Sequence, residues 1–174
     1  MLREKHSTLP AVYIVNLYNA LITPHLDYAD IIWGGCSQTN SNKLQKVQNF
    51  AAKSITGNKK SDSATASLQK LRFLTLKQRR NVHETTFAHK SILALNPTNI
   101  NAEFLQNQPT SNTRNSLKGK LNLPVHSTSK YTASPLYRSI KSWNAVPNHI
   151  SNDNPKTLKT DLQKYLINKT YPKH

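Results

Sequence analysis

The chain has 174 residues, and its 24 Lys and Arg against 8 Asp and Glu give a formal charge of +16. Such a charge opposes compaction, so we expect a polyanionic partner, with nucleic acid ahead of an anionic membrane surface. No apolar run reaches the ~20 residues of a membrane span. The single Cys36 excludes a disulfide framework or a cysteine-based zinc knuckle, and the few glycines disfavour phosphate loops. The composition therefore indicates an intracellular protein of nucleus or cytoplasm.

The first predicted helix begins at Ser7 or Thr8, with Pro10 in its first turn. Apolar side chains then recur at helical spacing as far as Ile22. Pro24 should end or bend this helix, because proline lacks an amide donor. The stretch 26–33 is apolar enough to be buried, as a helix or as extended chain.

The clearest amphipathic segment is a predicted helix over 42–56, with a cap at Asn40 or Ser41 and a stop at Gly57. One arc of this helix is apolar and is expected to face the core; it holds Leu44, Val47, Ala51 and Ile55. A different arc is basic, with Phe50 beside it; it holds Lys43, Lys46 and Lys53. Burial of the apolar arc would therefore expose the amines together.

The rest of the chain predicts further helices joined by irregular segments. We expect helices at 64–71, from Leu76 to about Leu95, from Pro135 to Pro147, and from Pro155 onward, with a possible short strand at 121–123. The polar stretch 107–120 has little to bury and is the predicted flexible linker between a helical region (1–106) and a C-terminal helical tail (121–174). The predicted fold is mainly α, a small helical bundle with irregular connections and at most one short β element.

The acidic and histidine residues do not form a recognisable catalytic or metal-binding pattern. A two-metal polymerase or nuclease needs several converging carboxylates, and of the acids here Asp27 and Asp30 lie closest to forming such a pair. Tyr28-Ala29-Asp30 is similar to the Tyr-x-Asp-Asp turn of reverse transcriptases, but Ile31 replaces the second Asp. We therefore predict no catalytic residue, metal, cofactor or small-molecule substrate, and assign Asp27 and Asp30 a structural role.

The basic residues are the stronger functional candidates, because lysine and arginine suit phosphate as a point charge and as a fork of donors. They gather on the 42–56 helix, just beyond its end, and at the start of the next long helix. With Phe50 as a stacking surface, which Tyr131 also could provide, the predicted nucleic-acid-binding set is Lys43, Lys46, Phe50, Lys53, Lys59, Lys60, Lys77, Arg79 and Arg80. The alternative for each single lysine is an ordinary solvated helix face.

Four blocks in order resemble the C-terminal region of the reverse-transcriptase polyproteins of non-LTR retrotransposons (LINE, jockey-like). They are Leu17–Tyr28 with Ile32–Gly34, Lys43–Lys53 with Ile55–Gly57, Leu71–Arg80, and Tyr137–Pro147. Phe50 departs from the family, where this position is often Arg, as does Lys53, where Arg is also common. Both departures weaken a bidentate phosphate site.

The resemblance implies a thumb-like and post-thumb helical module that holds template RNA and primer DNA beside a polymerase. The palm with its catalytic acids, and an endonuclease domain, would precede Met1, so we expect a truncated portion that is not catalytic alone, although its parent would be an RNA-directed DNA polymerase. Its partners would be RNA or DNA and that upstream domain, without a membrane. Two alternatives are a protein-interaction domain, which docks a partner helix on the Leu44–Ile55 or the Leu158–Leu166 face, and a translated relic without function.

Overall fold

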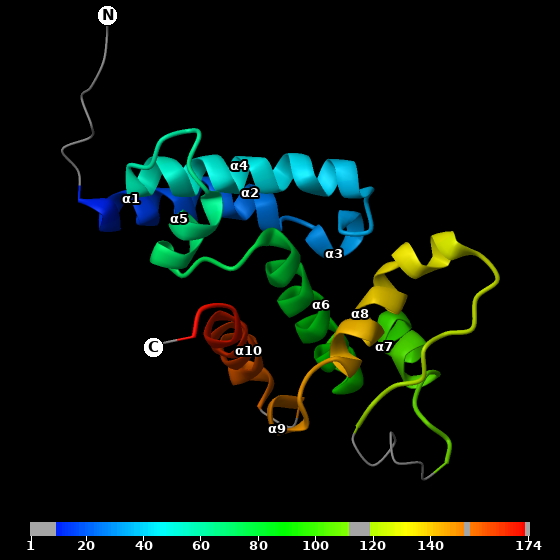
Figure 1. Ribbon diagram of the computed structural model, residues 1–174. Helices are drawn as coiled ribbons and strands as arrows, with labels where there is room; N and C mark the ends of the chain where they lie inside the picture. Colours follow the sequence, from blue (N-terminus) through cyan, green and yellow to red (C-terminus); the bar gives the residue numbers. More distant parts are fainter. Residues whose placement is uncertain (1–9, 112–118, 152–153, 173–174) are drawn as a thin grey trace, which may run out of the picture.

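The computed structural model describes residues 10–111, 119–151 and 154–172, and these ranges are helical with no strand (Figure 1). The mainly α prediction is confirmed. Two groups of helices are visible, one built around α4 and one around α6, and the N-terminal helices run alongside α4. None of the described helices combines the length and the apolar character needed to cross a bilayer.

The N-terminal segment remains helical past Pro24, where the sequence predicted an end or a bend. Its elements are α1 (Ala11–Leu17), a π-helical turn η1 (Tyr18–Ile22), α2 (Thr23–Asp27) and α3 (Asp30–Trp33). The wide turn closes with the amide of Thr23 donating to the Tyr18 carbonyl. Proline has no amide to donate to the carbonyl four residues earlier, and its ring crowds that carbonyl. The wide π turn directly before Pro24 breaks the regular i to i−4 pattern, so the helix can continue past the proline. The stretch 26–33, for which the sequence allowed helix or extended chain, is helical: it contains the end of α2, a turn at 28–29 and α3.

Next come α4 (Gln38–Thr56) and α5 (Ala64–Leu71), which pack against each other. Ser37 caps α4 by accepting from the Asn40 amide at 3.4 Å, so the helix begins earlier than Asn40 or Ser41. Gly57 ends α4 in the left-handed region, at φ 72°, as the sequence predicted. Ala52 of α4 and Leu68 of α5 are both buried, with Tyr171 from the far end of the chain beside them.

The central helix is α6 (Leu76–Ile92), which begins with a capping box between Thr75 and Gln78. It ends short of Leu95, because the chain turns through Ala94 at φ 55°. Pro97, which was predicted to close this helix, lies at the N-cap of a further helix, α7 (Thr98–Leu105). The sequence did not predict α7. Its buried Phe104 packs edge-on against Phe87 of α6 at 5.6 Å between ring centroids.

The C-terminal part contains a 3-10 turn η3 (Ser129–Ala133), α8 (Pro135–Asn144), a short α9 (Asn148–Ser151) and α10 (Pro155–Thr170). Helix α6 lies between α8 and α10 (Figure 1). Ser134 caps α8 with Pro135 in its first turn, as predicted.

The predicted strand at 121–123 is absent from the described residues, and side-chain bonds replace backbone pairing there. The Leu121 amide donates to Asn144 Oδ1 at 2.9 Å, and Asn144 Nδ2 donates back to the Leu121 carbonyl at 2.7 Å. The Trp143 indole donates to the Gly119 carbonyl at 2.9 Å. Most of the predicted linker, 112–118, lies outside the described residues, but its C-terminal end is fixed to α8.

One hydrophobic core joins the two sides of the predicted boundary at 107–120. Val82 of α6 and Phe104 of α7 belong to the same cluster as Ile140, Trp143 and Leu158 of the tail. The sequence predicted two regions, whereas these buried side chains pack as one unit. The predicted stripe of α10 is confirmed for Leu158 and Leu162, which are buried in this core.

Candidate nucleic-acid interface

The exposed face of α4 carries two amines and two apolar side chains in one stripe. Lys43, Lys46, Val47 and Phe50 fall at spacings of three and four residues, so they are neighbours on the helix surface. Phe50 is 65% exposed and Val47 is 48% exposed. The prediction that Val47 belongs to the buried arc is therefore wrong, while Ile55 of that arc is buried as expected.

A buried glutamine, Gln48, and a half-buried one, Gln45, explain this rotation of α4. Gln48 is 1% exposed, and its Nε2 donates to the Leu74 carbonyl at 2.9 Å. Gln45 Oε1 accepts from the Leu76 amide at 3.0 Å. These bonds tie α4 to the segment that leads into α6, and they satisfy backbone groups that would otherwise be buried without partners. Because position 48 faces inward, position 47 turns outward.

The basic groups beyond the end of α4 differ in how free they are. Lys53 is half-buried, and its Nζ donates to the Lys60 carbonyl at 2.8 Å, which fixes the loop onto the helix. Lys59 and Lys60 are exposed, and the Lys59 amide donates to Asp62 Oδ2 at 2.7 Å. Lys53 therefore positions the loop, while Lys59 and Lys60 offer their amines to solvent.

The three cations predicted to bind nucleic acid at the start of α6 lie in different surroundings. Lys77 is exposed. Arg79 forms a bidentate ion pair with Asp27 of α2, in which Nε to Oδ1 is 3.0 Å. Successive residues on a helix point about 100° apart, so Lys77, Arg79 and Arg80 reach different surroundings. Of these three, Lys77 alone offers its charge to solvent.

Arg80 is 8% exposed, and its guanidinium acts as an internal tie. Nη2 donates to Ser41 Oγ at 2.6 Å and Nη1 to the Gly34 carbonyl at 3.3 Å, while the group lies 5.5 Å from the centroid of the Trp33 ring. It therefore joins α6 to the start of α4 and to the turn after α3. The prediction that Arg80 meets phosphate from solvent does not fit this burial.

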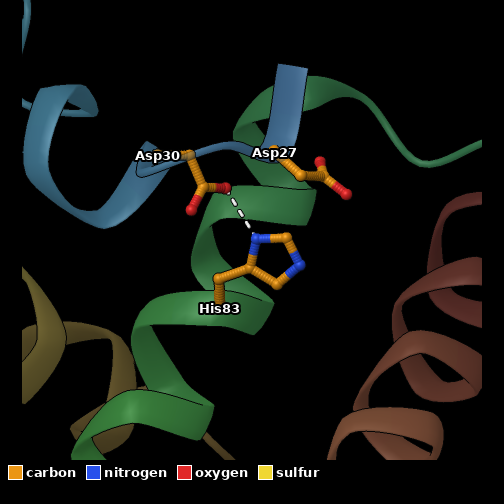
Figure 2. A group of neighbouring side chains, drawn as sticks. All are labelled: Asp27, Asp30 and His83. Atoms are coloured by element: carbon orange, nitrogen blue, oxygen red, sulfur yellow. Dashed lines mark hydrogen bonds and ion pairs between the residues drawn. The ribbon is translucent and has the colours of Figure 1, made fainter. Parts of the chain in front are cut away.

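Asp27, Asp30 and His83 converge from α2, α3 and α6, and the spacing of the two aspartates did not predict that His83 joins them (Figure 2). Their potential ligand atoms lie within 4.8 Å of one another. His83 Nδ1 is 2.6 Å from Asp30 Oδ2, and Asp27 pairs with Arg79. A cation here would have to displace both contacts, so the arrangement serves as a structural clamp.

A second internal clamp was missed by sequence reasoning. Arg138 of α8 donates from Nε to Glu84 Oε1 of α6 at 2.9 Å, and also to the Ala133 carbonyl at 2.9 Å and to the Ile31 carbonyl. Gly34 and Gly35 permit this approach, because a Cβ at Gly35 would overlap the Arg138 guanidinium and the Ala133 carbonyl. In the sequence, the paired glycines after Trp33 are the feature that could have indicated a close approach of another segment at this point.

Ion pairs inside the fold engage three of the acidic side chains, whereas many lysine amines are exposed to solvent. Asp27, Asp30 and Glu84 are engaged with Arg79, His83 and Arg138. Lysines on several helices are exposed, and no acidic partner is found for them within the described ranges; these are Lys43, Lys46, Lys70, Lys77, Lys90, Lys141 and Lys159. Because the pairs withdraw charges of both signs, the outer surface keeps the strongly positive balance of the sequence, and the chemistry it supports is the binding of anions. No protein-family model, curated protein or solved structure matches the chain.

Proposed function

We propose that the chain binds RNA or DNA, with little regard to base sequence, through the exposed face of α4 and the amines around it. The contact set on α4 and in the loop after it consists of Lys43, Lys46, Phe50, Lys59 and Lys60. Arg79, Arg80 and Lys53 position helices and the loop instead. Phosphates would bind the amines, and an unpaired base would stack on Phe50.

The observation that supports this proposal most directly is the unequal placement of charge. Carboxylates of Asp27, Asp30 and Glu84 are held inside by ion pairs, with Asp30 3% and Glu84 5% exposed. These carboxylates therefore do not offset the positive electrostatic potential of the exposed lysines at the surface. Displacement of counterions from a nucleic acid by such a surface is favourable without any special geometry.

The rival polyanion is an anionic membrane, and a competition experiment separates the two. The full chain is mixed with a labelled 30-nucleotide mixed-sequence RNA and titrated with vesicles of phosphatidylcholine and phosphatidylserine. We expect the RNA to stay bound at vesicle concentrations that present an equal charge. Transfer of the protein to the vesicles would contradict the proposal.

As to identity, we infer that the chain is the truncated C-terminal portion of a non-LTR retrotransposon reverse transcriptase, not catalytic by itself. The four sequence blocks and their order support this inference. The test is the genomic DNA just upstream of Met1. An in-frame palm sequence there is expected, and an unrelated flanking sequence would contradict it.

A protein-docking role is a second candidate, favoured by one exposed apolar stripe on the N-terminal helices. Tyr13, Leu17 and Leu21 recur every four residues and are 56%, 49% and 63% exposed. By contrast, the Leu158–Leu166 face proposed from sequence has its Leu158 and Leu162 covered by the chain itself. We propose the upstream polymerase domain as the partner. Leu17→Ser with Leu21→Ser should abolish its association in trans while RNA affinity is retained, and unchanged association would contradict this role.

A further inference from the structure

A cleft of about 650 Å³ lies between the start of α4, α6, α8 and α10. A volume of this size is typical of sites that enclose a small organic ligand or part of a polymer. Its walls come from segments far apart in the sequence, including Gln38, Lys77, Tyr137 and Tyr165. The cleft is distinct from the exposed face of α4, which bears Lys43, Lys46 and Phe50.

The charge inside the cleft is strongly positive. Its described lining contains four cationic side chains, Lys77, Arg80, Arg138 and Lys141, and one acidic side chain, Glu84. Glu84 is neutralised in place, because Arg138 Nε donates to Oε1 at 2.9 Å and Ser142 Oγ donates to Oε2 at 2.7 Å. A cleft lined by one sign of charge focuses the field and attracts the opposite ion.

The four cations divide into two kinds. Arg80 and Arg138 are tied to backbone and side-chain oxygens, so they supply a fixed positive background. Lys77 on α6 and Lys141 on α8 are exposed, and their amines are free to meet an incoming anion. Because α6 and α8 pack together, these two lysines lie on neighbouring walls of the same cleft.

Aromatic rings accompany the amines. Tyr137 lines the cleft and continues into a cluster with His126, at 5.1 Å between ring centroids, and Tyr131, at 6.3 Å. Tyr165 forms part of another wall, and Lys169 Nζ lies 5.7 Å from its ring centroid. Positive grooves with aromatic rings are the usual means of binding single-stranded nucleic acid, because the amines meet phosphates while the rings stack on bases.

We propose that this cleft binds a single-stranded segment of nucleic acid, with phosphates at Lys77 and Lys141 and a base stacked on Tyr137. This inference rests on the proposed function and adds the substrate form and its site. A duplex hides its base faces in the stack, so it can use the exposed lysines of α4 but gains nothing from a ring inside a cleft.

The test compares two probes on the full chain, a 12-nucleotide single-stranded RNA and a 12-base-pair RNA duplex. The variant Lys77→Gln with Lys141→Gln is matched by Lys90→Gln with Lys159→Gln, which removes the same charge from exposed positions outside the cleft lining. Loss of two phosphate contacts should lower the log–log salt slope for the single strand by about 1.4. The matched control, and the duplex slope, should stay as in the unmodified chain.

The ring is tested separately by Tyr137→Leu, with Tyr137→Phe as the conservative variant. One lost stacking contact weakens binding by about 5- to 150-fold, so Tyr137→Leu should weaken the single strand by that factor and leave the duplex unaffected. Tyr137→Phe should restore the affinity. Circular dichroism and urea unfolding of each variant identify those that are folded.

The outcomes separate this inference from the proposed function. If the unmodified chain binds RNA but the lysine and tyrosine variants, folded, bind the single strand equally well, the cleft is not the site. Equal losses for single strand and duplex would also overturn it, because they would reflect general charge. If the unmodified chain binds neither probe in a salt-dependent way, the proposed function fails and the cleft inference fails with it.

Discussion

Arg138 and Glu84 form an ion pair between α8 and α6, at 2.9 Å, with side chains that are 14% and 7% exposed. Removing one partner of such a pair leaves a charge inside without compensation, which costs about 3 kcal/mol. Glu84→Ala should therefore lower the free energy of unfolding by roughly that amount in urea. The exposed Glu103 gives a matched control, and Glu103→Ala should change stability by less than about 0.5 kcal/mol.

Adding Arg138→Met to Glu84→Ala should recover part of the loss, because the double variant no longer holds an unpaired guanidinium. A Glu84→Ala variant as stable as the Glu103→Ala control would show that the pair does not clamp the two helices.

The glycines after Trp33 give a second prediction. Gly35→Ala should destabilise the fold by about 1 to 3 kcal/mol, since the new methyl group would overlap the Ala133 carbonyl and the Arg138 guanidinium. Gly57→Ala has open space around its Cβ but a φ of 72°, and should cost about 1 to 2 kcal/mol from backbone strain alone. Urea unfolding combined with Arg138→Met distinguishes the two mechanisms. That second change should relieve part of the loss in the Gly35→Ala variant, because the overlap with the Ala133 carbonyl remains, and none of the loss in the Gly57→Ala variant. Equal behaviour of the two variants would contradict the overlap with the guanidinium.

His89 predicts a pH dependence of stability. Its ring stacks on Trp143 at 5.1 Å between centroids, its Nδ1 has no hydrogen-bond partner among the described residues, and burial lowers its pKa. As the pH falls below about 6.5, His89 is therefore protonated in the unfolded chain before it is protonated in the folded chain. The contribution of the neutral, buried His89 to stability is complete above that pH and is lost as the pH falls below it.

His89→Phe keeps a ring against Trp143 and removes the titration. Urea unfolding between pH 7.5 and pH 5 should show a smaller loss of stability in this variant than in the unmodified chain. Parallel curves for the two proteins would show that His89 does not titrate differently on folding.

The fold class and most helix boundaries were predictable because local signals determine them. Ser134-Pro135 marks the start of α8, Gly57 the end of α4, and helical spacing marks Leu158 and Leu162 as core. Helix α7 is not predicted by the sequence pattern, because Pro97 indicates the end of the preceding helix, although proline is also tolerated at the start of a helix.

The orientation of α4 and the fate of the arginines depended on tertiary contacts that spacing does not show. Apolar periodicity assigned Val47 to the core, but the bond from Gln48 to the Leu74 carbonyl turned the helix. Arg79 and Arg80 were predicted to contact nucleic acid, yet Arg79 pairs with Asp27, and Arg80 bonds to Ser41 and to the Gly34 carbonyl. A sequence shows which charges exist, but their availability depends on residues 39 to 52 positions away.

The most direct test of nucleic-acid binding through α4 is the salt dependence of affinity for a mixed-sequence single-stranded RNA, measured by fluorescence anisotropy. Lys43→Gln with Lys46→Gln is compared with the unmodified chain and with Lys90→Gln plus Lys159→Gln as the charge-matched control. Glutamine keeps helix propensity nearly unchanged, so the fold should be retained. We predict steep weakening with salt and a log–log slope lower by about 1.4 in the α4 variant only. Affinity independent of salt, or the same slope in the α4 variant and the unmodified chain, would contradict the account.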